Sequence, residues 1–77
     1  MKVYDPPIIT NGIYRHFKGN LYTVIGIAEH SETREDLVIY RSHKSGEIWA
    51  RPASMWNDIK DGRRRFTYLG YSVPKTE

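Results

Sequence analysis

Cysteine is absent from this chain of 77 residues, which excludes a disulfide and a thiolate zinc site. Long apolar runs are absent too, because no stretch approaches the roughly 20 residues that a membrane-spanning helix needs. Pro6 and Pro7 interrupt the amino terminus before the apolar core of a signal peptide can form. These absences predict a soluble, cytoplasmic protein that has no membrane partner.

The chain is also short and only mildly charged. A domain of this size buries only about 60% of the surface that its unfolded chain exposes, so oligomerisation is the general remaining source of extra stability. Twelve Lys and Arg against nine Asp and Glu give a net charge of +3, which favours anionic partners weakly. Aromatic residues make up 13% of the chain and predict either a well-filled core or a binding face.

β-prone runs separated by turn signals predict a single all-β domain. Residues 1–11 are expected to form an extended arm, residues 12–71 the domain and residues 72–77 a tail. Runs rich in β-branched and aromatic residues predict five strands, at 12–17, 21–30, 37–42, 47–51 and 64–70. In the first turn, Gly19 or Asn20 is expected to take a positive φ angle.

The segment after the fourth strand distinguishes between two barrel folds. Pro52 cannot donate to a sheet, so we expect the fourth strand to end at Arg51. A short helical turn then follows, in which Met55 or Trp56 plugs one end of the barrel. An OB-like barrel usually has a longer helix between its strands, so the sequence predicts a small five-stranded SH3-like barrel instead.

The second strand is apolar on both of its faces, although one face of so small a barrel should meet water. Two explanations are open. A bulge at Gly26 changes the register, or a contact between subunits buries the second face. The second explanation makes a homo-oligomer one of the expected states.

His30, Ser31, Glu32 and Thr33 follow this strand in a row. They contain the residue types of a nucleophilic triad, but successive residues of an extended chain point to alternate sides, so they cannot form a relay among themselves. Either they shape their loop through bonds to the backbone, or they present polar groups to a ligand. The three histidines lack the spacing of metal ligands, so we expect no metal. No plausible catalytic pair emerges elsewhere in the sequence, so we expect no cofactor and no enzymatic activity.

A second cluster lies on the fourth strand. Alternation places Trp49 and Arg51 on the same face, where a guanidinium beside an aromatic surface suits a phosphate, a carboxylate or a stacked base. The alternative is that Trp49 belongs to the core and that Arg51 pairs with Glu47 or Glu29.

The one basic run consists of Arg63, Arg64 and Arg65 and precedes Phe66 and Tyr68. Such a mixture of charge and stacking surfaces is typical of proteins that bind single-stranded RNA or DNA. A solvated turn followed by a charged strand edge would look the same in the sequence.

Several of these segments together resemble the small bacterial and phage domains of the domain-of-unknown-function family 1653. The resemblance runs from about Tyr14 to Phe66 and is carried by YRHFKG at 14–19, HSET at 30–33, Trp49 with Arg51-Pro52, and Met55. The turn at 42–47 and Arg64 depart from the family pattern. The family name implies no activity. The resemblance does imply that residues 30–33 match a family motif, which weakens the interpretation that they only connect two strands.

The sequence therefore predicts a non-enzymatic binding module for a small anionic or nucleotide-like ligand. A phage protein of this size would fit the role of sequestering a host nucleotide signal. The expected ligand-binding residues are Arg15, His30, Ser31, Glu32, Thr33, Tyr40, Trp49 and Arg51. The alternatives are nucleic-acid binding through Arg63, Arg64 and Arg65, and a protein-interaction barrel.

Overall fold

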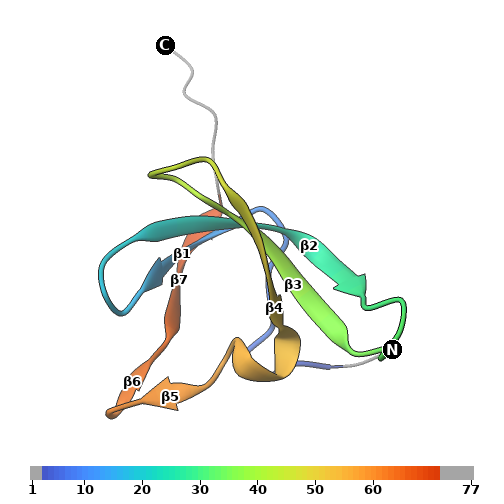
Figure 1. The fold of residues 1–77 in the computed structure, drawn as a ribbon. Coiled ribbons are helices and arrows are strands. Elements are labelled where there is room, and N and C mark those ends of the chain that lie inside the picture. The colour runs from blue at the N-terminus through green and yellow to red at the C-terminus, as the bar shows by residue number, and fades with distance from the viewer. Residues whose placement is uncertain (1–2, 72–77) are drawn as a thin grey trace.

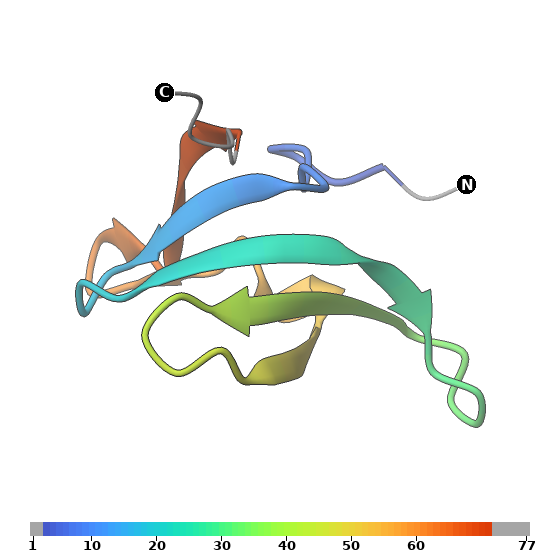
Figure 2. The same cartoon turned by 90° about the horizontal axis from the view of Figure 1, so that it is seen from above.

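A computed structural model describes residues 3–71, so the expected tail at 72–77 lies outside the described residues. Five strands form one antiparallel sheet in the order β4-β3-β2-β1-β7 (Figures 1 and 2). These strands are β1 (Gly12–His16), β2 (Leu21–Glu29), β3 (Asp36–Ser42), β4 (Ile48–Pro52) and β7 (Phe66–Tyr71). The expected all-β class is therefore confirmed. No helix within residues 3–71 has the length and apolar character needed to cross a membrane.

Two short elements connect β4 to β7. The 3-10 helix η1 (Ala53–Met55) follows β4 directly, and it is the short helical turn that the sequence predicts. A hairpin of two two-residue strands, β5 (Ile59–Lys60) and β6 (Arg63–Arg64), comes next and was not foreseen. Figure 1 shows η1 and this hairpin on the same side of the curved sheet.

Most strand ends differ from the expected ones by one or two residues, and two of these differences have a clear physical cause. Pro52 belongs to β4 and lies opposite Leu37, because β4 is an edge strand on which a missing N–H is tolerated. The fifth strand begins at Phe66 instead of residue 64, because the Arg65 N–H bonds to the Asp58 carbonyl at 3.0 Å. Arg64 therefore belongs to the hairpin.

The bulge expected at Gly26 is present. Val24 lies opposite Tyr40 and Gly26 lies opposite Ile39, so β2 has one extra residue between them. Ile25 and Ile27 nevertheless remain 41% and 42% exposed. The bulge changes the register without removing apolar side chains from the surface. In the first turn Gly19, with φ 108°, takes the positive angle that the turn needs.

The core is an aromatic cluster on the inner face of the sheet. Trp56, which follows η1, is fully buried and stacks on Phe66 of β7, with ring centroids 3.9 Å apart and planes 4° from parallel. Tyr14 and Tyr40 meet the same indole edge to face, at 5.2 Å and 5.1 Å. Of the two residues expected to fill the interior after the fourth strand, Trp56 is buried, whereas Met55 is 45% exposed.

The amino-terminal arm lies against the domain through long-range hydrogen bonds. The Tyr4 hydroxyl donates to the Asp36 carboxylate, which raises the pKa of Tyr4 to about 12. The Asn57 side chain donates to the Pro6 carbonyl at 2.8 Å. These bonds join the arm to β3 and to the segment after η1.

We predict that Gly12→Ala destabilises the protein by about 1–3 kcal/mol, because the added methyl overpacks its surroundings. A Cβ at Gly12 would lie 2.8 Å from a ring carbon of Tyr68 and 2.9 Å from the Ile9 carbonyl oxygen. Gly26→Ala is the matched control, since a Cβ there meets nothing within 4 Å. Urea unfolding of both variants measures the difference, and equal stabilities would contradict the prediction.

Candidate functional site

Two adjoining cavities lie beside β1, β7 and the hairpin. The first, which we call the apolar cavity, has a volume of about 400 Å³ and is lined by Pro6, Pro7, Ile9, Tyr14, Asn57, Arg64, Phe66, Thr67 and Tyr68. The second, the basic cavity, has a volume of about 290 Å³ and is lined by Arg15, His16, Phe17, Arg63, Arg64 and Thr67. Arg64 and Thr67 line both, so the two cavities are neighbours, and together they are the candidate site in two parts.

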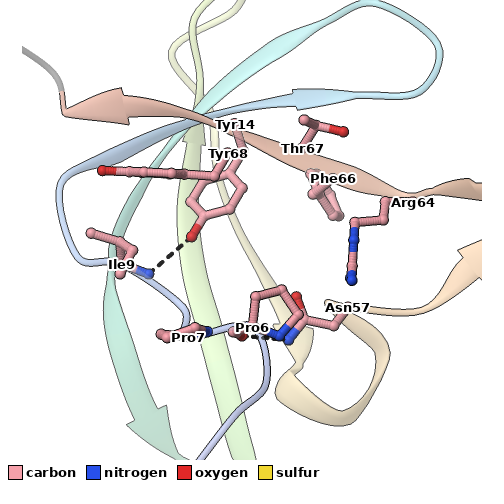
Figure 3. Close-up of a pocket in the computed structure, with 9 residues that line it drawn as sticks. All are labelled: Pro6, Pro7, Ile9, Tyr14, Asn57, Arg64, Phe66, Thr67 and Tyr68. Carbon is pink, nitrogen blue, oxygen red and sulfur yellow. Dashed lines mark hydrogen bonds between the residues drawn. The ribbon is translucent and has the colours of Figure 1, made fainter.

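The apolar cavity is formed by segments from both ends of the chain (Figure 3). Tyr14 of β1 and Tyr68 of β7 lie opposite each other in the sheet, and their ring centroids are 5.3 Å apart. The Tyr14 hydroxyl accepts the Ile9 N–H at 2.9 Å, and burial is the main cause that raises the pKa of this tyrosine. Pro6 and Pro7 of the arm supply the facing wall.

The basic cavity gathers the positive charges of three arginines. Arg15 of β1 lies opposite Thr67 of β7, and Arg63 and Arg64 come from the hairpin. Among the described residues, none of these three arginines has a carboxylate within ion-pair distance. The Arg63 guanidinium lies over the Phe17 ring, 5.4 Å from its centroid. Free guanidiniums beside an aromatic ring suit an anionic group on a planar ligand.

Arg65, the third member of the basic run, has a different role. Its Nε donates to the Asp58 carboxylate at 2.9 Å, and both side chains are largely shielded from solvent. This ion pair crosses the base of the hairpin. It leaves Arg63 and Arg64 as the members of the run that line cavities.

His16 lines the basic cavity as a neutral group near neutral pH. Burial, followed by the positive charges of Arg65 and Lys18, lowers the pKa of its imidazole. Its Nδ1 accepts the Lys18 N–H at 3.1 Å, which requires that this nitrogen carry no proton. The side chain therefore contributes an aromatic wall.

The structure gives residues 30–33 a local structural role. The His30 Nδ1 accepts the backbone N–H groups of Glu32 and Thr33, at 3.1 and 3.3 Å. The Thr33 hydroxyl donates to the Glu35 carboxylate at 3.3 Å. These bonds close the turn between β2 and β3, as the loop-shaping interpretation expects. Binding of a ligand by His30, Ser31, Glu32 and Thr33 stays a prediction.

The expected ligand-binding residues are spread over the sheet. Arg15 lies opposite Leu21 at the start of β2, whereas His30 follows the end of that strand, about 30 Å further along an extended chain. A single small pocket cannot contain both. Of the eight expected residues, Arg15 alone lines either the apolar or the basic cavity.

The three remaining residues of the expected site lie on β3 and β4. Tyr40 is 9% exposed and belongs to the core, so it cannot offer a free stacking face. Trp49 is 50% exposed on the edge strand, which corrects the alternative that it is a core residue. The Arg51 Nε donates to the Met55 carbonyl at 3.1 Å, and its guanidinium lies 5.9 Å from the Phe66 centroid. Arg51 therefore stabilises the turn after β4, and it pairs with neither Glu47 nor Glu29.

Sequence reasoning missed the contribution of the arm and of Asn57. Their proximity depends on a contact between positions 51 residues apart, for which the sequence has no local signal. The Pro6-Pro7 pair was the nearest indication, since two prolines favour a stiff extended segment that can form a wall. Within residues 3–71, no three His, Asp or Glu side chains lie together as metal ligands would.

The fold and the cavities define a small all-β domain with a two-part candidate binding site. The chain belongs to the DUF1653 family, described as a protein of unknown function, whose model matches residues 12–68. It is similar to the crystal structure of a DUF1653 protein from Bordetella bronchiseptica, with 31% sequence identity and a TM-score of 0.75. That similarity covers 87% of this chain and 95% of the other. No curated protein matches the chain.

We predict that the Arg65–Asp58 pair makes the fold acid-sensitive. The Arg65 guanidinium lowers the pKa of Asp58 below its ordinary value of 3.8. The pair therefore stabilises the folded state above pH 3.8, and this contribution is lost as the pH falls through the lower pKa of the folded state. Asp58→Asn should thus flatten the dependence of unfolding free energy on pH between about pH 5 and pH 2.

Asp61→Asn is the control for this measurement. It removes an exposed carboxylate that makes no ion pair among the described residues. Urea unfolding over the same pH range should give wild-type behaviour for this variant. An Asp58→Asn protein that loses stability with acid as steeply as the wild type would show that the pair has no such role.

Proposed function

We propose that this protein is a non-enzymatic binding module for a small nucleotide-like ligand, which has an anionic group and a planar ring. The proposal rests on one observation, the sharing of Arg64 and Thr67 by the apolar and basic cavities. A ligand that spans this junction places its ring against Tyr68 and its anionic group among the arginines. This ligand class is the one that the sequence predicts. We propose that its site lies at β1, β7 and the hairpin instead of at residues 30–33.

The dimensions and charge of the site support this ligand class. A volume of about 400 Å³ for the apolar cavity is within the range of about 300–1,000 Å³ that is common for small-molecule pockets. Guanidiniums bind phosphate and carboxylate groups through two parallel hydrogen bonds, and Arg15, Arg63 and Arg64 form no ion pair with any other described residue. The ring walls of Tyr68 and Phe66 offer apolar contact area.

The residue types in the cavities support binding rather than catalysis. Within residues 3–71, no carboxylate lines either cavity, and the imidazole of His16 already accepts a backbone hydrogen bond through Nδ1. General acid–base catalysis needs a titrating group within reach of the reacting atoms. The lining arginines and tyrosines fit a role in holding a ligand.

We also propose that the curved sheet is an SH3-like barrel. Five antiparallel strands with a short 3-10 turn between the fourth and the last are the order of that fold. The stacking of Trp56 on Phe66 across the concave side supports it, because it joins the turn to the last strand.

We predict that Arg64→Ala and Arg15→Ala each weaken binding of a nucleoside monophosphate about tenfold, because each removes a charged hydrogen-bond donor. Isothermal titration calorimetry against adenosine 5′-monophosphate measures this effect. His30→Ala is the control for the site expected from the sequence and should bind like the wild type. Loss of binding in His30→Ala with retention in Arg64→Ala would place the site at residues 30–33 instead.

Single-stranded nucleic acid is a second candidate ligand. Arg63 over the Phe17 ring and the exposed rings of Tyr68 and Tyr71 on β7 favour it, because bases stack on such surfaces. Binding to an oligonucleotide would strengthen with its length, weaken steeply with salt and fall in Arg63→Ala. A mononucleotide ligand would show no dependence on length and a shallower dependence on salt.

A homo-oligomer stays a prediction that rests on the exposed apolar residues of β2. Ile25 and Ile27 are each about two-fifths exposed beside the bulge. If this surface joins subunits, native mass spectrometry at micromolar concentration should show dimers or larger species, and Ile25→Lys should convert them to monomers. A wild-type protein that is monomeric under these conditions would contradict the prediction.

A further inference from the structure

We infer that the apolar cavity selects planar heterocycles that carry an N–H donor, and that the Asn57 side-chain oxygen accepts that hydrogen. This inference rests on the proposed function, since it names the ring chemistry of the same ligand. It assigns Asn57 as the residue that determines specificity, whereas Arg15, Arg63 and Arg64 provide affinity for the anionic group.

The orientation of the Asn57 amide is fixed by its partner. Its Nδ2 lies 2.8 Å from the Pro6 carbonyl oxygen. A backbone carbonyl only accepts hydrogen bonds, so the side of the amide that faces Pro6 must be the nitrogen. The oxygen, Oδ1, is therefore the group that is turned away from the Pro6 carbonyl (Figure 3).

This oxygen is an open acceptor. No residue within 3–71 donates a hydrogen bond to it. If this unpaired oxygen were fully buried, it would be a buried polar atom without a partner. Within the same residues the one such side-chain atom is Trp56 Nε1, so the Asn57 oxygen retains solvent contact. Because Asn57 lines the apolar cavity, the oxygen faces a space that a ligand can enter.

The other walls leave selectivity to this group. Pro6, Pro7, Ile9 and Phe66 have no polar side-chain atoms, and the Tyr14 hydroxyl has the Ile9 N–H as its partner. The Tyr68 hydroxyl points away from Asn57 (Figure 3). Arg64 and Thr67 lie where the cavity joins the basic cavity, among the groups that we assign to the anion. An amide oxygen accepts from an amino group or a ring N–H, so a heterocycle with such a group gains a hydrogen bond that a bare ring lacks.

The experiment compares three ligands that share a ribose phosphate but differ in their base. Adenosine 5′-monophosphate has an exocyclic amino group, purine riboside 5′-monophosphate lacks only that group, and ribose 5-phosphate has no base. We expect calorimetry of the wild-type protein to show that adenosine 5′-monophosphate binds about three- to tenfold more tightly than its purine riboside counterpart, the effect of one net hydrogen bond. Ribose 5-phosphate should bind most weakly.

Asn57→Leu should bring the affinities of the two nucleotides together, because it removes the acceptor. It also removes the bond to Pro6, so Tyr4→Phe is the matched control. That variant loses the bond between the arm and Asp36 without touching the cavity lining, and it should keep the preference for the amino group.

The outcomes separate the two proposals. A wild-type protein that binds none of the three phosphates would overturn the proposed function. Equal affinity of the wild type for the two nucleotides would overturn the role of Asn57 alone, and this comparison needs no variant to fold. A preference that persists in Asn57→Leu would also overturn it.

Discussion

The stacking of Trp56 on Phe66 holds the two ends of this sheet in their relative positions. The indole comes from the turn after the edge strand β4, and the phenyl ring from β7, the edge strand on the other side. Tyr14 and Tyr40 pack edge to face against the same indole from β1 and β3. With few other buried side chains available, this cluster supplies most of the volume that keeps the sheet curved.

The same cluster positions the candidate site, because Tyr14 and Phe66 belong to both. Their packing against Trp56 fixes the rings, and the cavity surfaces are the remaining sides of those rings. The Arg65–Asp58 pair adds the second constraint by fixing the base of the hairpin. Two free guanidiniums, those of Arg63 and Arg64, are thereby held close to the core without being neutralised by it.

Local sequence signals account for the sheet and its irregularities. The five strands follow β-prone runs, the bulge at Gly26 follows from a strand that is apolar on both faces, and Trp56 was one of two plugs expected. The hairpin of β5 and β6 was missed because each strand has two residues, too few for a period to appear. For the same reason Arg65 could not be distinguished from its two neighbours before its partner Asp58 was seen.

The candidate site was harder to foresee, because it depends on contacts between distant positions. Arg15, Arg63 and Arg64 were identified as candidates from their charge and line the same cavity. The sequence analysis assigned Arg15 to a small-ligand site, whereas it assigned Arg63 and Arg64 to nucleic-acid binding. Residues 30–33 drew attention by their composition, and their hydrogen bonds turn out to be local to one loop. Tyr40 was expected either to stack on a ligand or to pack, and it is buried, because alternation along a strand does not reveal which of its faces the sheet curls around.

The bond between Asn57 and Pro6 has a thermodynamic consequence. Because the arm forms one wall of the apolar cavity, any ligand that touches both Pro6 and Asn57 binds the docked arm more tightly than the released arm. Linkage is reciprocal, so such a ligand also shifts the arm toward its docked position, by the same free energy. Occupancy of the cavity and protection of the segment around Pro6 against proteases would then rise together.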